Sequence, residues 1–424
     1  MKYKRYPKYK DSGVEWIGEI PEGWEIKKIK FTSYVKGRIG WQGLTSQEYI
    51  EKGPYLITGT DFKDGIINWE SCHHVEQWRY EQDPYIQIKN NDILITKDGT
   101  IGKIAFVEDV PGDTTLNSGV MVVRPLNNSI LPKFQNWIFN SRLFTDFIEF
   151  IKSGTTINHL YQEEFGKFTF PVPPIDEQEK LYDFLQNETT QFDELIAKSK
   201  AQVTLLEEKR QATITQAVTK GLDPSVKMKD SGVEWIGEIP EHWEVKKLKF
   251  VTSCLDGKRI PLNGDERNPG IFPYYGASGI VDYIDDYIFD EKLVCLSEDG
   301  ENLRSRQLPI SFIIEGKTWV NNHAHVLKPI NYNHSFLAYF LNSINITPFL
   351  EGATRSKLNQ ASMNNIFLTN PSLPEQQQIE DFLQKQTTQF DELIAKSKTQ
   401  VTLLEEKRQA LITATVTGKI DVRK

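Results

Sequence analysis

The sequence has few cysteines, no long apolar run and no excess of positive charge. Its three cysteines, Cys72, Cys254 and Cys295, are widely spaced without a Cys-x-x-Cys pair, so neither a disulfide framework nor a thiolate zinc site is predicted. No stretch of about 18 apolar residues is present, and the basic N-terminal residues are followed by no apolar signal-type segment. We therefore expect a cytoplasmic protein in a reducing compartment, with no membrane partner.

Sequence signatures of catalysis are also missing. There is no GxxxxGK[ST] nucleotide-binding loop, no Asn-Pro-Pro-Tyr or Asp-Pro-Pro-Tyr motif of an amino-methyltransferase, and no HExxH. The cluster Cys72, His73 and His74 has no second set of ligands at metal-binding spacing. The pair His323 and His325 has none either. We expect no catalytic residue, no metal and no cofactor, so that any chemistry must come from partner subunits.

The chain of 424 residues is long enough for two or three domains, each with its own core. Its formal net charge of -8 is unusual for a protein that holds DNA by itself, because such proteins are usually basic. A DNA-binding function then requires basic residues clustered on one face, or a partner that supplies the phosphate contacts. The sequence leaves both explanations open.

Two segments of the sequence occur twice. Residues 10–31 return as residues 229–250 with three changes, and residues 189–212 return as residues 387–410 with one change. The stretches between the repeats differ in length and in nearly every residue. A plain tandem duplication does not explain why only these stretches diverged, whereas a frame that presents two different binding domains does. We therefore interpret the repeats as a frame and the inserts as the functional parts.

The second repeat has the pattern of a long helix. From Phe192, apolar or small residues recur at alternating steps of four and three, which is typical of a coiled-coil seam. Gly221 and Gly418 predict the helix ends, and each helix is expected to run for about 35 residues, or roughly 50 Å. Since two like helices can bury their apolar stripes against each other, we predict an antiparallel pair, with separate packing on each domain as the alternative. The predicted seam residues are Phe192, Ile196, Val203, Leu206, Phe390, Ile394, Val401 and Leu404.

The first repeat carries two tryptophans around an Ile-Pro pair, Trp16 and Trp24 in one copy and Trp235 and Trp243 in the other. This pattern favours a segment that docks a helix end onto a domain. The second copy directly follows the first helix, whereas its twin starts the sequence. Pseudo-two-fold symmetry therefore predicts that the N-terminal segment lies beside the end of the second helix.

Both inserts have the pattern of strand-rich domains. In the first, residues 57–69, 91–107 and 117–126 alternate apolar and polar residues between glycine-containing turns, and a helical stretch follows at 131–151. The second insert repeats this order more loosely. The predicted fold class is α/β (α+β), with two globular domains separated by two long, antiparallel coiled-coil helices in a pseudo-two-fold internal repeat.

This layout resembles the specificity subunit of type I restriction-modification systems over nearly the whole chain. The resemblance is carried by helices that end in KRQA, WIGEIPEGW-type segments, Asp-Gly turns at Asp98 and Asp299, the segment NNHAHVLKP, and Gly-Thr-Thr and Gly-Ala-Thr at 154–156 and 352–354. It implies that each insert is a target-recognition domain for one half of a bipartite, asymmetric site in double-stranded DNA. It also implies that the helix pair sets the spacing and binds two methyltransferase (modification) subunits. Restriction subunits with ATP-dependent translocase and endonuclease activity are the further partners that it implies.

Base-edge readout requires polar and basic side chains on exposed elements, and glycine-led segments in both inserts supply them. Lysines and arginines near the Asp-Gly turns are candidates for phosphate contacts. For each residue, a polar loop, a helix cap or a solvated surface is the alternative interpretation. The predicted DNA-binding residues are Lys97, Lys103, Thr155, Thr156, Asn158, His159, Arg304, Arg306, Arg355, Ser356, Lys357 and Asn359.

The predicted domain division is 1–31 (first repeat segment), 32–172 (target-recognition domain 1), 173–222 (spacer helix 1), 223–250 (second copy of the repeat segment), 251–370 (target-recognition domain 2) and 371–424 (spacer helix 2). Two other functions stay open. One is a coiled-coil scaffold that binds only proteins, which the acidic charge favours. The other is the recognition subunit of a related methyltransferase-nuclease assembly outside type I. Salt-dependent duplex binding distinguishes the first alternative, and ATP-dependent cleavage by the assembled complex distinguishes the second.

Overall fold

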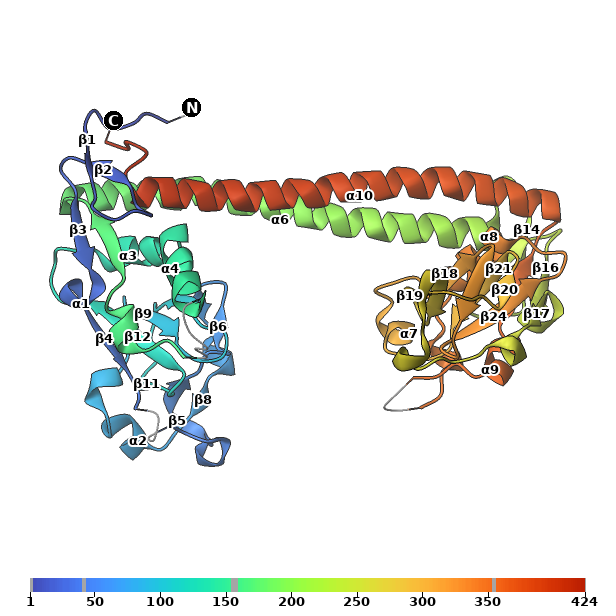
Figure 1. Ribbon diagram of the computed structural model, residues 1–424, viewed down its shortest axis with the longest axis horizontal. Helices are drawn as coiled ribbons and strands as arrows, with labels where there is room; N and C mark the ends of the chain where they lie inside the picture. The colour runs from blue at the N-terminus through green and yellow to red at the C-terminus, as the bar shows by residue number, and fades with distance from the viewer. Residues whose placement is uncertain (1–2, 40–42, 154–158, 353–355, 424) are drawn as a thin grey trace. The chain divides into compact units, whose positions relative to one another are not determined.

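The computed structural model divides the chain into two compact units (Figure 1). Unit 1 comprises Met1–Ser199 together with Gln400–Lys424, and unit 2 comprises Lys200–Thr399. Each unit contains one copy of the first repeat, one insert and a part of each of two long helices. The observed fold class is the predicted one. The structure describes residues 3–39, 43–153, 159–352 and 356–423.

Unit 1 contains a mixed sheet with helices on one face. Its strand order is β4 (Ser33–Gly37), β12 (Val120–Pro125), β9 (Ile93–Thr96), β10 (Ile104–Phe106), β7 (Ile66–Ile67) and β6 (Phe62–Lys63). Alternate residues of β9 and β12 enter two different cores, as the period of two in a strand requires. Ile95 and Met121 pack with helices α3 (Pro132–Phe139) and α4 (Arg142–Ser153). The smaller sheet, which packs on the other face, consists of β11 (Thr114–Leu116), β5 (Ile50–Ile57) and β8 (His73–His74).

Unit 2 repeats this plan with two four-stranded sheets. The order of its first sheet is β17 (Thr252–Cys254), β24 (Ala324–Pro329), β21 (Leu293–Ser297) and β22 (Ser311–Ile314). The order of its second sheet is β19 (Gly279–Ile284), β18 (Pro269–Gly276), β23 (Lys317–Val320) and β20 (Phe289–Asp290). Helix α8 (His334–Ser343) packs Phe336 and Phe340 on the first sheet. The antiparallel order β17-β24-β21 therefore corresponds to β4-β12-β9 of unit 1.

Short paired strands frame each insert at its two ends. In unit 1, the hairpin of β1 (Tyr9–Asp11) and β2 (Glu19–Pro21) precedes β3 (Glu25–Lys28), which pairs with β13 (Thr169–Val172). Unit 2 has the same elements in β14 (Met228–Asp230), β15 (Glu238–Pro240), β16 (Glu244–Lys247) and β25 (Phe367–Asn370). The first repeat thus clamps the beginning of an insert to its end.

The long helices are α6 (Ile175–Lys220), with 46 residues, and α10 (Leu373–Val416), with 44 residues. The predicted length of about 35 residues was too short, because the seam pattern was followed only from Phe192. The first turns of each helix lack that pattern and pack on an insert core instead, through Leu181 and Leu185 in unit 1. The glycines that were predicted to end the helices have positive φ, 74° at Gly221 and 72° at Gly418, a region that glycine adopts without strain.

Within each unit the two helices run antiparallel. In unit 2, Glu207 of α6 pairs with Lys398 at 2.9 Å and Arg210 pairs with Asp391 at 2.9 Å, so the α10 numbers fall as the α6 numbers rise. In unit 1, Asp193 pairs with Arg408 at 2.8 Å, which is the same aspartate-arginine pair from the other copies of the repeat. The helix pair is therefore self-complementary, as predicted. The seam residues of both copies lie at positions of low or intermediate exposure, namely Phe192, Ile196, Val203, Leu206, Phe390, Ile394, Val401 and Leu404.

The N-terminal segment lies beside the end of α10, which confirms the prediction from symmetry. The Tyr9 hydroxyl donates to the Gly418 carbonyl at 2.9 Å, and the Asp421 amide donates to the Lys4 carbonyl at 2.9 Å. Trp24 packs against Gly418, and its twin Trp243 packs against Gly221 in unit 2. The first repeat therefore docks a helix end in both units.

Two sequence-based exclusions concern the membrane and the cysteines. No helix in the part of the chain that the structure describes has both the length and the apolar character needed to cross a bilayer. Cys72, Cys254 and Cys295 are free thiols, and burial raises the pKa of Cys72 to about 12 and that of Cys254 to about 11. These thiols are therefore protonated near neutral pH.

Candidate nucleic-acid interface

Each unit joins its Asp-Gly turn to a segment that lies just beyond the insert helices. In unit 1, Asp98 forms a β-bridge with His159, and the Leu160 amide donates to the Lys97 carbonyl at 2.8 Å. Gly99, the second residue of the turn, has φ 66°, which requires the freedom of glycine. The turn is therefore fixed against the segment that starts at His159.

Unit 2 has the same junction. Asp299 forms a β-bridge with Lys357, and the Leu358 amide donates to the Glu298 carbonyl at 2.7 Å. Gly300 has φ 108°. Two sequence motifs that lie far apart in each insert are thus brought together at one end of the sheet. We refer to residues 97–99 with 159–160 as the unit 1 junction, and to residues 298–300 with 356–358 as the unit 2 junction.

The predicted residues of unit 1 have different environments. Lys103 is exposed, whereas Lys97 is half-buried, with its ammonium nitrogen 3.4 Å from the Arg38 carbonyl, and burial lowers its pKa. The His159 ring bonds the Asp98 carboxylate. Lys103 and His159 are therefore accessible to a ligand, while Lys97 is partly engaged. Thr155, Thr156 and Asn158 lie outside the described residues.

In unit 2, Arg304 and Lys357 are exposed side chains at the junction. The Arg304 guanidinium donates to the Ser356 hydroxyl, and the Lys357 ammonium lies 3.1 Å from Glu298. Ser356 itself is buried. The junction therefore presents two cations that are oriented by neighbouring side chains. Arg355, which was also predicted to contact DNA, lies outside the described residues.

Two of the predicted DNA contacts have structural roles. Arg306 turns inward and donates to the carbonyls of Asn342 at 2.7 Å and Ile344 at 3.2 Å, at the end of α8. Asn359 is the N-cap of α9 (Gln360–Asn364), where it accepts the Ser362 amide at 2.7 Å. Both side chains therefore cap a helix, which was the alternative interpretation of these residues. The backbone carbonyls and amides at a helix end have no partner within the helix and need one from a side chain. A DNA contact is no longer assigned to either residue.

The junctions of the two units differ at equivalent positions. Ile95 pairs with Met121 in unit 1, and Leu296 pairs with His325 in unit 2, each three residues before the aspartate of the Asp-Gly turn. Met121 and His325 are therefore equivalent. By the same register, Gly37 beside Met121 corresponds to Asp256 beside His325, and Lys97 corresponds to Glu298. Unit 1 thus has an apolar and basic set where unit 2 has a charged network.

The unit 2 network was not predicted from the sequence. Arg259 bridges two carboxylates, 3.2 Å from Asp256 and 2.6 Å from Glu298. Burial raises the pKa of Asp256, but the His325 hydrogen bond and charge, the Val326 amide and Arg259 together lower it below its usual value. Asp256 is therefore a carboxylate at neutral pH.

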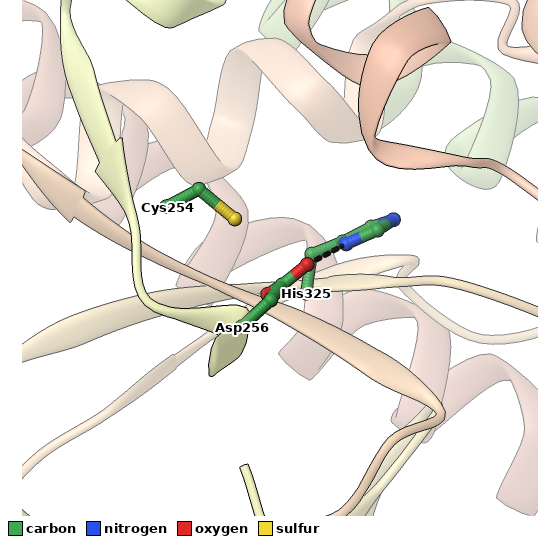
Figure 2. A group of neighbouring side chains, drawn as sticks. All are labelled: Cys254, Asp256 and His325. Atoms are coloured by element: carbon green, nitrogen blue, oxygen red, sulfur yellow. Dashed lines mark hydrogen bonds and ion pairs between the residues drawn. The ribbon is translucent and has the colours of Figure 1, made fainter. Parts of the chain in front are cut away.

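Three potential metal ligands meet in this network, with ligand atoms of Cys254, Asp256 and His325 all within 4.8 Å of one another (Figure 2). Both Asp256 oxygens and both His325 ring nitrogens already have hydrogen-bond partners. The geometry therefore fits a hydrogen-bonded ion network better than a metal site.

Unit 1 has a buried cation in the corresponding region. The side chain of Arg38 is fully buried, and it donates to the Leu116 carbonyl at 2.7 Å and to the Thr115 hydroxyl at 3.0 Å. No periodicity or short motif marks Arg38 in the sequence, because its partners come from a distant strand. It orders the start of the segment that follows β4.

A family model for the type I restriction modification DNA specificity domain matches this chain twice, over residues 21–205 and 240–403. The chain belongs to this family. Both matches include an insert, its clamping strands and most of the following helix. The specificity subunit therefore contains two target-recognition domains in one chain.

One similar specificity subunit matches nearly the whole length of this chain, and another matches about a third of it. The MjaX specificity subunit of Methanocaldococcus jannaschii is 24% identical over 96% of each chain. The S.HindORF215P specificity subunit of Haemophilus influenzae is 33% identical over 36% of this chain and 37% of its own. The likeness thus includes both repeats and both inserts.

Solved structures share the fold. A chain from a type I restriction-modification system, solved to study complex assembly and conformational transition, matches with a TM-score of 0.72 at 15% identity, over 95% of this chain and 99% of its own. The HsdS subunit from Thermoanaerobacter tengcongensis matches with a TM-score of 0.52 at 14% identity, over 97% of this chain and 100% of its own. At these identities the match concerns the fold alone.

Proposed function

We propose that this specificity subunit recognises double-stranded DNA, with each unit reading one half of a bipartite, asymmetric site. In this proposal the insert boundaries are residues 32–172 and 251–370, and the junctions carry the contacts. Lys103 and His159 act in unit 1, and Arg304 and Lys357 act in unit 2. The continuous helices α6 and α10 set the separation of the half-sites.

The observation that carries the proposal is the contrast between a shared frame and different junctions. The clamping strands, the helix ends and the aspartate-arginine pairs are the same in both units. By contrast, Gly37, Lys97 and Met121 of unit 1 are replaced in unit 2 by acidic and imidazole side chains. Because these side chains are largely buried beneath the junctions, they orient the exposed junction residues of the two units differently, as recognition of two different base sequences requires.

Partners complete the function in this proposal. The chain has a net charge of -8, so part of the phosphate contact comes from other subunits. Two methyltransferase subunits bind the helical region and supply adenine methylation, and restriction subunits supply ATP-dependent translocation and cleavage. The specificity subunit itself performs no chemistry. The family match disfavours a scaffold that binds only proteins.

Genome-wide mapping of methylated adenine tests the DNA-reading function. We expect that co-expression with the cognate methyltransferase in a methylation-free host yields one split, asymmetric motif. Exchange of residues 251–370 for another insert should change only one half of that motif. A complex that assembles but methylates nothing would instead support a protein scaffold, and cleavage without ATP would place the assembly outside type I.

Exposed leucines on the helices support a partner that binds in two copies. Leu205 and Leu403 occupy the same position of the repeat and are 50% and 48% exposed, and Leu195 and Leu393 are both 48% exposed. Packing within the chain does not account for these side chains, whereas burial in a protein interface would stabilise a complex. Two equal sites fit two copies of one methyltransferase.

A double substitution tests these leucines. We expect Leu205→Glu with Leu403→Glu to weaken methyltransferase binding by about tenfold or more, because each carboxylate would have to be desolvated in an apolar interface. Titration calorimetry with the purified methyltransferase measures the effect. Thr204→Glu with Thr402→Glu adds the same charges at neighbouring exposed positions and should change the affinity little. Equal losses in both variants would assign the effect to charge alone.

A further inference from the structure

His325 has hydrogen-bond acceptors on both sides of its ring. Nδ1 lies 2.6 Å from Oδ2 of Asp256, and Nε2 lies 2.7 Å from the carbonyl oxygen of Leu358. A carbonyl oxygen and an ionised carboxylate can only accept, so each contact requires an N–H on the ring. A neutral imidazole has one N–H and cannot satisfy both. The geometry therefore requires the imidazolium form of His325.

The surroundings of the ring support a positive charge. The side chain is 2% exposed, and Glu298 adds a second carboxylate 3.7 Å from Nδ1. Arg259 is bound to both carboxylates, Lys357 is bound to Glu298, and the Cys254 thiol lies beside the ring (Figure 2). A buried charge is stable only when it is paired and hydrogen-bonded, and here both ring nitrogens have partners.

The Leu358 carbonyl belongs to the unit 2 junction. The amide of Leu358 donates to the Glu298 carbonyl at 2.7 Å. The preceding residue, Lys357, forms two backbone hydrogen bonds with Glu351, at 2.8 and 2.9 Å. Leu358 itself is buried. The hydrogen bond from His325 therefore holds the Leu358 carbonyl against β24. Leu358 directly follows Lys357, which is proposed to contact DNA.

We propose that His325, as the imidazolium, is the positioning residue for the DNA-reading junction of unit 2. The proposal rests on the proposed function of that junction. Unit 1 has Met121 at the equivalent position and Gly37 in place of Asp256, so it has no counterpart of this link. This link thus supports recognition of the half-site read by unit 2 and leaves the half-site read by unit 1 unaffected.

Loss of the proton would break one of the two contacts. A charge-assisted hydrogen bond to a carboxylate is stronger than one to a neutral carbonyl, so the remaining proton stays between His325 and Asp256. Nε2 then presents a lone pair to the Leu358 carbonyl, and the segment loses this attachment. Half-site selectivity of unit 2 accordingly depends on the protonated ring.

Nitrogen NMR of the full chain, labelled with 15N-histidine, tests the protonation state directly. The histidine signal that is absent from the spectrum of His325→Gln belongs to His325. We expect this ring to carry protons on both nitrogens in the wild type at neutral pH. His325→Met, which introduces the residue of unit 1, provides a second assignment if the first variant does not fold. A neutral His325 would overturn the proposal. So would binding of Zn²⁺ or Co²⁺ at this cluster in the wild-type chain with release of the proton.

Competition binding by the methyltransferase complex tests the consequence for recognition. DNA duplexes altered in one or the other half of the mapped motif compete with the intact site. We expect His325→Gln to reduce discrimination at the half-site of unit 2 by roughly tenfold or more, and to leave the other half-site unchanged.

His334→Gln is the matched control, because it removes another histidine of unit 2, one that bonds the Lys292 carbonyl. This variant should retain the wild-type discrimination at both half-sites. Equal discrimination by wild type and His325→Gln would overturn the positioning role while leaving the proposed function intact. A wild-type complex that discriminates at neither half-site would instead refute the proposed function.

Discussion

Trp24→Ala is expected to destabilise unit 1 by about 3–5 kcal/mol, the usual cost of removing a large aromatic side chain from a core. Trp24 is 1% exposed, and its ring lies 5.8 Å from that of Tyr6, between centroids. It also covers Gly418 at the end of α10. The substitution would therefore open a cavity where the N-terminal segment, the insert and the helix end meet. Urea denaturation followed by circular dichroism measures the loss.

The same repeat provides the control. Trp16 is 57% exposed, so Trp16→Ala should change stability by no more than about 0.5 kcal/mol. Trp243→Ala, at the twin of Trp24, should destabilise unit 2 as strongly as Trp24→Ala destabilises unit 1, because it is equally buried and covers Gly221. Similar effects of Trp16→Ala and Trp24→Ala would mean that the segment does not dock the helix end.

The frame of the molecule could be predicted because its determinants are local and occur twice. The period of the apolar residues from Phe192 specifies a helix with one buried stripe, and Gly221 and Gly418 specify where helices end. The antiparallel pairing and the position of the N-terminal segment then follow from symmetry alone. The predicted length of about 35 residues was too short because the first turns pack on an insert core, through residues such as Leu181, and do not continue the seam.

The junctions could be predicted only in outline. The Asp-Gly turns and the glycine-led segments are visible in the sequence, but their contact is not, because it joins residues about 60 positions apart. Arg306 was predicted to contact phosphate and Asn359 a base edge, because a cation or an amide in a polar segment suits DNA contact and helix capping equally well. The network of Asp256, Glu298 and His325 had no local signal, as each residue comes from a different strand or turn.

A shortened chain that ends at Leu222 is expected to assemble as a homodimer. The core of unit 1 includes Ile412 and Val416 of α10, and the same positions of α6 are Ile214 and Val218, which pack in the core of unit 2. In the shortened chain, Ile214 and Val218 of each copy can occupy the place of the missing α10 residues in the other copy. Burial of each such side chain contributes about 1.5–3 kcal/mol, so the exchange favours a dimer at micromolar concentration.

Analytical ultracentrifugation of the shortened chain measures the assembly. Ile214→Asp with Val218→Asp should prevent it, because two carboxylates would enter an apolar core. Gln216→Asp, at an exposed position of the same helical turn, should leave the dimer intact. In the dimer, Asp193 of one copy would pair with Arg210 of the other copy, in place of the pair between Asp193 and Arg408. Reversing the charge at one of these two positions should weaken the dimer, and reversing both should restore it. A helical monomer at every concentration would show that the two copies of the repeat are not interchangeable, and that the differences after residue 212 determine which helix each core accepts.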